Sequence, residues 1–517
     1  MSGAPYRRVE MNRPYRSAFD NSHFKIFDCD LGQLIPVLCK KMVPGDSFKI
    51  SNEIVIRANP LVAPIMHEIN VFTHYFFVPL RLLWPKPDYE GTGVETGSWE
   101  EFFTGGIDGL LEPVKPKWIP TTPAHVATHT LWDYFGFPID VIPTGSFPDA
   151  WPLRAYNLVW NEYYRDQNYM NEVDLDDWNL KRRCWEKDYF TTALPWQQRG
   201  QAPALPITGV TSAVWDDSRF STLADTNSRV NAGFVNTVAA LGTSSALLTN
   251  NLRMLFNDNS VDLSNASTFD VNDLRLAFQT QKFLERNARA GGRYIEQLKA
   301  HYGVSPRDDR MQRPEYVGGT RTPVIVSEVL QTSETSTESP QGTLAGHGMT
   351  VDQQYVANYY APEFGVLIGI MSMMPRPVYQ QGIDREWLGE TRWDELLPEF
   401  VSLGEQPVYQ AEIYATGSEA DNKKVFGFQG RYDEYRSSNN KVCGLLRNSA
   451  SQSLSFWHIA RYFQTAPALN SEFLTCDPRK DYLAVPSLPG WIVTFGNYLR
   501  TVRPLPVYGT PGLIDHH

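Results

Sequence analysis

Residues 69–79 read INVFTHYFFVP and residues 364–374 read FGVLIGIMSMM, and these two runs decide the fold class. Both are apolar, rich in β-branched, aromatic or other bulky side chains, and bounded by proline or glycine breaks. Such short apolar runs between turn residues are typical of β-strands. We therefore predict that strands, and not helices, build the interior of this protein.

Further strand patterns lie on either side of these two runs. Alternating or apolar segments occupy residues 31–38, 46–57, 404–414 and 423–432. Helices are expected at only a few places. Residues 153–167 place Leu153, Tyr156, Trp160 and Tyr163 on one face at helical spacing, which indicates core packing, and SLSFWHIARYF at 453–463 predicts a short helix.

The composition favours a mainly β fold with large connections. The chain has 517 residues, of which 42% are hydrophobic and 13% aromatic, with 36 glycines and 36 prolines. This balance suits an antiparallel β-sandwich with long loops and short helices inserted between strands better than a helical bundle. The excess length then needs no second domain.

The charge and the cysteines restrict the possible functions. A formal net charge of −11 is unlike the basic footprint of free nucleic-acid-binding proteins, so enclosed DNA would need counter-charge from a basic partner, polyamines or cations. The five cysteines have no paired spacing, which predicts reduced thiols. The first residues lack an apolar signal core, and no run is long enough to cross a membrane, so we expect a cytosolic protein.

Residues 274–319 form the most distinctive stretch of the chain. Helical periodicity runs from Leu274 to Ala288, a pair of glycines ends it, and a second short helix is expected at 293–302. The segment RDDRMQRPEYVGG at 307–319 then combines charges, a tyrosine and two glycines without any periodicity. We expect it to meet solvent, a ligand or another chain.

Ordered phrases along the chain resemble the major capsid protein of the Microviridae, the small circular single-stranded-DNA phages, and in particular its gokushovirus branch. The phrases include RAYNLVWNEYYRDQN (154–168), LERNARAGGRYIE (284–296), HYGVSPRDDRMQRPEYVGG (301–319), SLGEQPVY (402–409) and VFGFQGRYDEYR (425–436). The resemblance covers most of the chain from Arg16 to Ala468. It implies a single eight-stranded viral jelly roll and a structural role without catalysis.

The resemblance also implies partners. Sixty copies would form an icosahedral shell of the simplest kind around a circular single-stranded DNA genome. A small basic DNA-binding protein, a minor pilot protein and a host surface receptor would be further partners, with no membrane insertion and no cofactor. The chain would be a virion component, assembled in the host bacterial cytoplasm.

We expect three regions. Residues 1–20 form a basic arm, in which Arg7, Arg8, Arg13 and Arg16 either are simply solvated or contact DNA phosphates. Residues 21–476 form the jelly-roll domain, and residues 477–517 form a proline-rich tail that wraps a neighbour. Residues 221–268 are rich in Ser, Thr and Asn, and read either as an ordinary mobile loop or as an outward excursion that faces the host through Arg229, Asn231, Asn250 and Asn251.

The segment at 307–319 is the candidate contact between subunits. Arg310 and Arg313 could pair with carboxylates of a neighbour, with Glu315 and Tyr316 beside them, while Gly318 and Gly319 would allow a close backbone approach.

No catalytic or metal-binding arrangement is predicted. His125 and His129 lack the glutamate of a zinc helix, and the carboxylate pairs Asp384/Glu386 and Asp394/Glu395 are expected to form structural ion pairs. Two other functions stay open. A carbohydrate-binding or carbohydrate-active β-sandwich shares the aromatic and acidic composition, and a scaffold or spike protein of the same kind of virus is a weaker possibility.

Overall fold

The computed structural model describes residues 16–84, 97–104, 113–199, 276–282, 285, 312–324, 326–330 and 344–508. The chain divides into two units, one formed by Met1–Gln197 with Gly291–His517 and the other by Gln198–Ala290. Within the second unit, residues 276–282 are helical, as the periodicity predicted. The rest of the first predicted helix, the second one at 293–302, and the polar stretch 221–268 lie outside the described residues.

Two antiparallel sheets form the body of the first unit. The larger sheet contains β1 (Ser17–Asp20), β2 (His23–Cys29), β4 (Ser47–Ala58), β7 (Val326–Leu330), β8 (Leu344–Tyr360) and β12 (Trp491–Arg503). The smaller sheet has the order β3 (Ile35–Met42), β9 (Gly365–Pro375), β5 (Ile69–Pro79) and β6 (Glu315–Val324). The prediction of a mainly β, antiparallel sandwich is confirmed.

Several connections cross between the two sheets, because β3 lies between β2 and β4 in the sequence but in the other sheet, whereas consecutive strands such as β5 and β6 share one sheet. The larger sheet contains the order β2-β12-β4-β8, and the smaller sheet follows β3-β9-β5-β6. Two short strands extend the larger sheet, because β1 pairs with the C-terminal part of β12 and β7 pairs with the N-terminal part of β8.

The interior of the sandwich follows from side-chain alternation. In β4 and β12, every second residue is buried, including Phe48, Ile54, Trp491 and Phe495. These side chains pack against residues of the smaller sheet such as Met371. A period of two with one buried face is what an antiparallel sheet with one open face requires.

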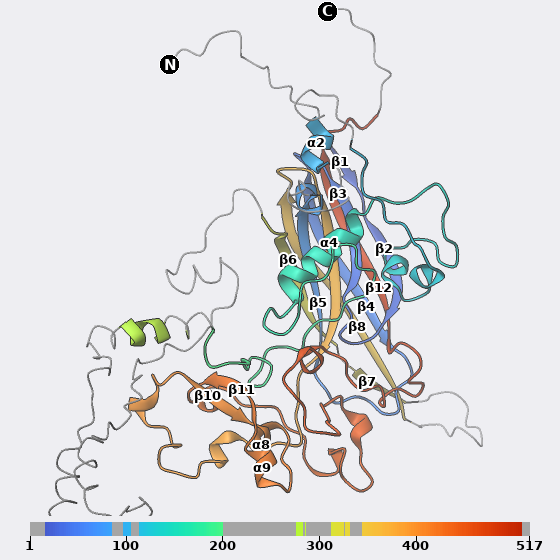
Figure 1. The fold of residues 1–517 in the computed structure, drawn as a ribbon. Coiled ribbons are helices and arrows are strands. Elements are labelled where there is room, and N and C mark those ends of the chain that lie inside the picture. Colours follow the sequence, from blue (N-terminus) through green and yellow to red (C-terminus); the bar gives the residue numbers. More distant parts are fainter. Residues whose placement is uncertain are drawn as a thin grey trace, which may run out of the picture. The chain divides into compact units, whose positions relative to one another are not determined.

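The smaller sheet is different, because both of its faces are covered. Every residue of β9 is buried. Its outer face meets α1 (Leu80–Leu83), α2 (Trp99–Thr104), α3 (Leu131–Tyr134), α4 (Trp151–Val159) and the π-turn η3 (Trp160–Tyr164), and Figure 1 shows α4 lying across the strands. Six tryptophans fill this layer: Trp84, Trp99, Trp118, Trp132, Trp151 and Trp160.

The predicted helix at 153–167 is confirmed by α4 and η3, and a buried arginine holds it in place. Arg154 makes two hydrogen bonds to Asp176, at 2.8 and 2.7 Å, and one to the carbonyl of Leu83 at 3.0 Å. A guanidinium paired in this bidentate way has its charge satisfied although it is buried.

A smaller region is built from later parts of the chain. The hairpin-like pair β10 (Glu405–Tyr409) and β11 (Val425–Gly430) packs with α8 (Gln410–Ile413), α9 (Glu419–Asn422) and α10 (Ser471–Leu474) (Figure 1). Its core contains Phe190, Val408, Phe426 and Phe473. The 3-10 turns of this later part of the chain are η7 (Arg385–Trp387), η8 (Pro398–Phe400), η9 (Asp433–Tyr435), η10 (Gly444–Leu446) and η11 (Ser455–Trp457), whereas η2 (Pro123–Val126) belongs to the helical layer.

Three expectations need correction. The segment 453–463 is helical only in η11, since the amide of Arg461 bonds to the carbonyl of Val378 and holds the chain extended. Residues 404–414 form a strand, β10, only in their first half, and most of their second half forms the helix α8. The segment 307–319, expected to lack regular structure, runs into strand β6.

Parts of the expected arm and of the expected tail form strands of the larger sheet. Residues 491–503 of the predicted tail form β12, which lies between β2 and β4 in the larger sheet. Residues 17–20 of the predicted arm form β1 in the same sheet. Prolines lie on either side of β12 and not within it, so the high proline count of the tail gave no sign of a strand there.

Replacement of Ile368, fully buried in the middle of β9, should show how far stability depends on the doubly covered sheet. We expect Ile368→Ala to lower the free energy of unfolding by about 3 kcal/mol, because it leaves a cavity between layers that cannot collapse. Urea denaturation of the unassembled full-length chain measures this change. The matched control Val351→Ala, at a side chain 58% exposed, should cost no more than about 1 kcal/mol, and equal effects would contradict the assignment.

Candidate subunit interface

Strand β6 forms an edge of the smaller sheet. It pairs with β5, and no other described strand pairs with its second side. An edge strand presents backbone donors and acceptors that another chain can use. Pro323 lies in its second half, where it removes one donor and limits such pairing to the first half of the strand.

The first half of β6 carries a partly exposed aromatic cluster. Tyr316 is 49% exposed, and its ring lies 5.5 Å from Phe76 and 5.9 Å from His74. His74 Nδ1 is 2.8 Å from the hydroxyl oxygen of Tyr164, and the two rings stack. Burial, together with the nearby charge of Arg183, lowers the pKa of His74 to about 4. The imidazole is therefore neutral at neutral pH and acts as a packing element.

Internal contacts anchor the start of β6. The guanidinium of Arg313 lies 5.6 Å from the ring centre of Tyr163, whose hydroxyl donates to the carbonyl of Pro314 at 2.5 Å. Glu315 accepts a hydrogen bond from the hydroxyl of Tyr359 at 2.6 Å. Arg313 and Glu315 are thus brought together with Tyr316 at one edge, as the sequence suggested, but each already has a partner in its own chain.

Contacts within the chain explain why two positions of β6 are glycines. A Cβ on Gly319 would lie 2.6 Å from the carbonyl oxygen of Thr73, and a Cβ on Gly318 would lie 3.2 Å from a methyl group of Val356. The space that these glycines leave is filled by β5 and β8 of the same chain. Both glycines therefore allow a close approach within the chain, and the approach of a neighbour's backbone stays a prediction.

The other predicted contact residues are only partly described. Arg16 is exposed, and its guanidinium lies 5.9 Å from the ring centre of Tyr360 in β8. Arg7, Arg8, Arg13 and Arg310 lie outside the described residues, as do the four residues proposed to face the host, Arg229, Asn231, Asn250 and Asn251.

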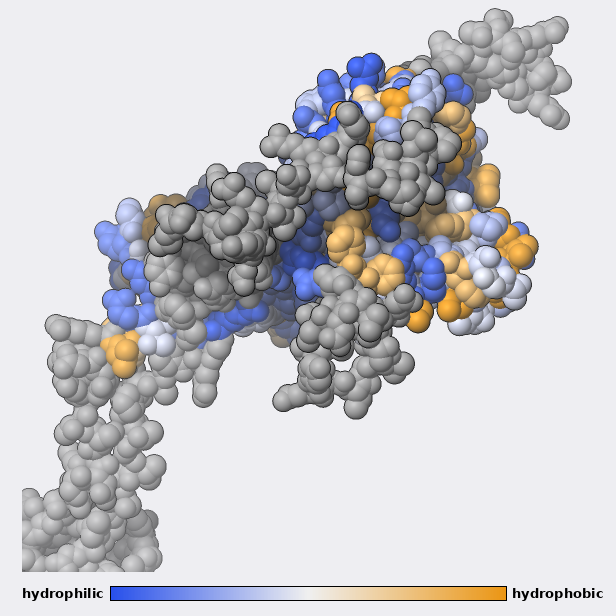
Figure 2. Space-filling view, turned by 90° about the horizontal axis from the view of Figure 1, so that it is seen from above, coloured by the Kyte–Doolittle hydropathy of each residue, from blue (hydrophilic) through white to orange (hydrophobic). Residues whose placement is uncertain are grey.

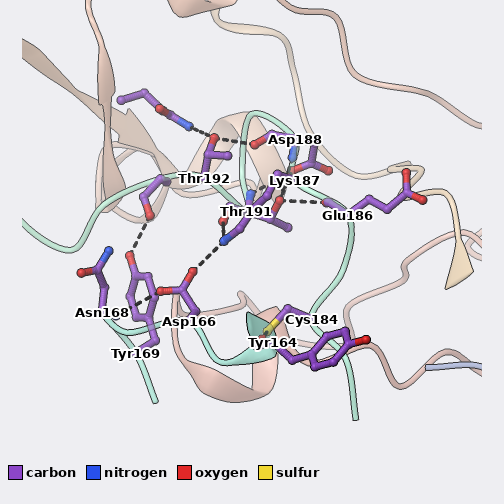
Figure 3. A network of polar contacts seen from close by, with 12 residues as sticks. Tyr164, Asp166, Asn168, Tyr169, Cys184, Glu186, Lys187, Asp188, Thr191 and Thr192 are labelled. Atoms are coloured by element: carbon purple, nitrogen blue, oxygen red, sulfur yellow. Dashed lines mark hydrogen bonds and ion pairs between the residues drawn. The ribbon is translucent and has the colours of Figure 1, made fainter. Parts of the chain in front are cut away.

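A polar network joins the end of the helical insertion to the β10–β11 region (Figure 3). Lys187 Nζ is 2.6 Å from Asp166 Oδ2, and the hydroxyl of Thr192 accepts from the side-chain amide of Gln429 in β11 at 2.6 Å. Between them, Asp188 accepts from the amide and the hydroxyl of Thr191 and closes the turn. The network fixes loops against one another and contains no unpaired nucleophile of the kind that catalysis needs.

The carboxylates considered as a catalytic pair have structural partners. Asp384 pairs with Lys441, while Asp394 accepts from the amide and hydroxyl of Thr391, and these bonds lower its pKa. The arginine between them, Arg385, bonds instead to Glu412 at 2.9 Å. Burial raises the pKa of Glu412, although the Arg385 charge opposes the shift.

The two histidines of the HVATH segment do not share a site. His125 stacks on Trp178 with the ring centres 4.0 Å apart, whereas His129 Nε2 is 2.9 Å from Asp28 Oδ2. Among the described residues, no group of three or more His, Cys, Asp or Glu side chains could hold a metal ion. None of the helices described is long and apolar enough to span a membrane.

Sequence reasoning missed one exposed apolar surface, at residues 384–403. Trp387 is 75% exposed, Trp393 is 50% exposed and Leu403 is 63% exposed. The two tryptophans stand among charged residues in REWLGETRWDELL, a pattern that could have marked them as surface aromatics. Figure 2 shows hydrophobic residues mixed with hydrophilic ones on the face seen from above.

Comparison with known proteins connects this geometry to a family. A family model described as "Capsid protein (F protein)" matches residues 8–513. Capsid protein VP1 of Chlamydia phage 1 is 34% identical, in an alignment that covers 96% of each chain. Capsid proteins VP1 of Bdellovibrio phage phiMH2K and Spiroplasma virus 4 are 32% and 30% identical, each covering 96% of this chain and 95% of the relative.

The buried imidazole of His74 should make stability depend on pH. Above about pH 6.5 it is neutral in both states, and as the pH falls toward about 4 the unfolded chain binds a proton that the folded chain does not. We expect a loss of about 2 kcal/mol from this group between about pH 7 and about pH 4.5, after discounting for its partial exposure.

The measurement compares urea unfolding of the parent and of His74→Gln at both pH values. Glutamine can still bond to Tyr164, and the other histidines whose pKa is lowered by burial, His67 and His458, are present in both proteins. The variant should lose less stability on acidification, and parallel profiles would exclude His74 as the cause.

Proposed function

The chain belongs to the phage capsid protein (F protein) family, and from this we propose that sixty copies form a small icosahedral shell around a circular single-stranded DNA genome. Family membership makes it a structural major capsid protein and a component of the virion, which assembles with itself and packages the phage genome. The alternative of a carbohydrate-binding sandwich has no support.

The observation that carries the proposal is the match over almost the whole chain combined with the antiparallel sandwich of two sheets. A closed shell needs heterologous contacts around its fivefold and threefold axes and an isologous contact at its twofold axes. A rigid sandwich with sheet edges and long connections offers several separate surfaces for these contacts.

We place one subunit contact at the first half of β6. Arg313, Glu315 and Tyr316 are gathered at a sheet edge whose backbone is available for pairing, and Tyr316 keeps half of its surface exposed. Aromatic and arginine side chains supply much of the energy at protein interfaces. Arg310 continues this segment, whereas Gly318 and Gly319 act inside the subunit.

A second contact comes from the chain after β12. Leu505, Val507 and Tyr508 are 54%, 59% and 83% exposed, an unusual run of apolar surface directly after a central strand. We propose that this end of the predicted tail wraps a neighbouring subunit, where these side chains would be covered.

The remaining partners follow from charge and sequence. With a net charge of −11, the shell requires basic counter-charge near the genome, for which a small basic DNA-binding protein is the natural source. The arm residues Arg7, Arg8, Arg13 and Arg16 would add phosphate contacts, and the segment 221–268 would meet the host receptor. A minor pilot protein completes the proposed set.

Particle formation tests the shell. We expect the full-length chain, produced with its basic partner where it does not assemble alone, to give uniform round particles in light scattering and negative-stain microscopy. A chain that stays monomeric under both conditions and binds glycans would contradict the shell and restore the carbohydrate-binding alternative.

Arg313→Ala tests the β6 contact. We expect at least a tenfold lower particle yield, of the order that loss of an interface arginine causes, on gradient sedimentation. Urea unfolding of the unassembled variant should stay within about 1 kcal/mol of the parent, because the partner of Arg313 is a partly buried tyrosine ring. Arg447→Ala, at an exposed arginine elsewhere in the chain, is the control, and equal yields for the two variants would remove Arg313 from the interface.

A further inference from the structure

One buried cation of this protein has no anionic partner. Arg461 is only 9% exposed, and it forms no ion pair with any residue that the structure describes. Its Nη2 atom donates a hydrogen bond to the carbonyl oxygen of Phe473 at 2.6 Å, whereas its Nη1 atom is buried and has no hydrogen-bond partner. A guanidinium keeps its charge when it is buried, so the unpartnered N–H groups call for an acceptor.

Other buried charges of the described residues show how this chain normally handles such a group. The buried cations Arg154 and Lys181 each form an ion pair with an aspartate. The buried acids Asp46 and Glu412 each form an ion pair with an arginine. Pairing of this kind is what makes a buried charge tolerable. Arg461 departs from this rule and is therefore a candidate for binding an external anion.

Aromatic rings surround the guanidinium of Arg461. Its central carbon lies 3.9 Å from the ring centre of Phe473, 5.0 Å from that of Trp185 and 5.2 Å from that of Phe463. Cation–π attraction to these rings reduces the penalty of burying the charge. It supplies no oxygen acceptor to the Nη1 edge of the guanidinium, which is the edge that a planar anion recognises.

The carboxylate of Asp188 acts on Arg461 only from beyond a tyrosine. The ring centre of Tyr379 lies 5.8 Å from the guanidinium carbon, and the Tyr379 hydroxyl donates to Asp188 at 2.6 Å. Asp188 also accepts from the amide and the hydroxyl of Thr191 (Figure 3). Its field favours the cation at a distance, but it forms no ion pair with Arg461 and leaves Nη1 without an acceptor.

Arg461 borders an open pocket of about 480 Å³. Trp185, Phe463 and Phe473 line the same pocket, so its wall joins an uncompensated cation to apolar rings. Backbone bonds hold Arg461 in place, because its amide donates to the carbonyl of Val378 at 2.9 Å and its own carbonyl accepts from a side-chain amide at 3.1 Å. A pocket of this size and character suits a small organic molecule.

The other charged residues of the pocket select the charge of that molecule. Arg479 and Asp477 line the pocket as well, and each already has an ion-pair partner. Glu472 lies at the exposed rim and pairs with no described residue. A ligand with one negative charge neutralises Arg461, whereas a dianion such as phosphate would also meet the carboxylates of Asp477 and Glu472. The lining therefore favours a monoanion.

We propose that this pocket binds a carboxylate attached to a small apolar or aromatic body, with the carboxylate on Arg461 and the body against Trp185 and Phe463. A carboxylate is planar, carries one charge and accepts parallel N–H bonds from a guanidinium edge. Residues 462–470 contain no helix or strand, so the side chains over Nη1 can part by the rotamer changes that are common on binding. The site lies within one chain and does not depend on shell formation.

Ligand-observed NMR titration of the unassembled full-length chain tests the proposal. The probes are benzoate, acetate, benzamide and inorganic phosphate, which separate the contributions of the ring and of the charge. We expect benzoate to bind most tightly. Benzamide should bind at least about tenfold more weakly, as expected when a charge-assisted hydrogen bond is lost. Acetate lacks the ring and phosphate has the wrong charge, so both should also bind more weakly than benzoate.

Two variants locate the binding. Arg461→Met removes the charge but keeps an apolar side chain among the rings, and it should weaken benzoate binding at least about tenfold. Its stability in urea should equal or exceed that of the parent, because an uncompensated buried charge is removed. Ala466→Trp, at an exposed residue that lines the pocket, fills the space without touching the charge and should give the same loss. The control Arg447→Met, at an exposed arginine, should bind like the parent.

Three results would overturn the proposal: no benzoate binding by the parent, equal binding of benzoate and benzamide, or unchanged benzoate binding by a folded Arg461→Met protein. If Arg461→Met does not fold, Ala466→Trp decides alone, and unchanged binding by that variant also overturns the proposal. None of these results bears on the capsid function, which particle formation tests separately.

Discussion

Complete burial of β9 is the constraint on which the rest of the structure depends. All of its residues, from Gly365 to Pro375, are inaccessible, and it lies between β3 and β5. A strand with apolar side chains on both faces needs cover on both sides. The larger sheet provides one cover, and the tryptophan-rich layer of α1 to α4 provides the other. The helices α1 to α4, which lie between β5 and β6 in the sequence, are therefore part of the core, and the pair of the buried Arg154 with Asp176 holds α4 in place.

The larger sheet has the opposite character, because only one of its faces is buried. Its centre is completed by β12, the last strand of the chain, which pairs with β4 over nearly its whole length and with β1 and β2 on its other side. These contacts join residues more than 400 positions apart, and such distant pairing is slow to form. The sheet is complete only when strands from both ends of the sequence pair. The start of β1 and the end of β12 are therefore neighbours in it.

The sequence predicted the strands whose pattern reflects burial. The runs at 69–79 and 364–374 form β5 and β9, because a short, continuous apolar run between turn residues is typical of a buried strand. Prediction from the sequence failed where contacts between distant residues determined the structure more strongly than the local sequence pattern. Thr73 and Val356 explain the glycines of β6, and Val378 keeps Arg461 out of a helix, but none of these partners is near in sequence. β12 was hidden by prolines that lie on either side of it.

The candidate surfaces were harder to predict for a related reason. Arg313, Glu315 and Tyr316 lie within four residues, so a charged segment could reveal them, whereas exposed aromatic residues such as Phe24, Tyr355 and Tyr498 come from three strands that only the register aligns. A net charge of −11 argues against DNA contact for the whole surface, but charge acts locally, within about a Debye length of 10 Å. An acidic protein can therefore still contain a locally basic segment, such as the arm that carries Arg7, Arg8, Arg13 and Arg16.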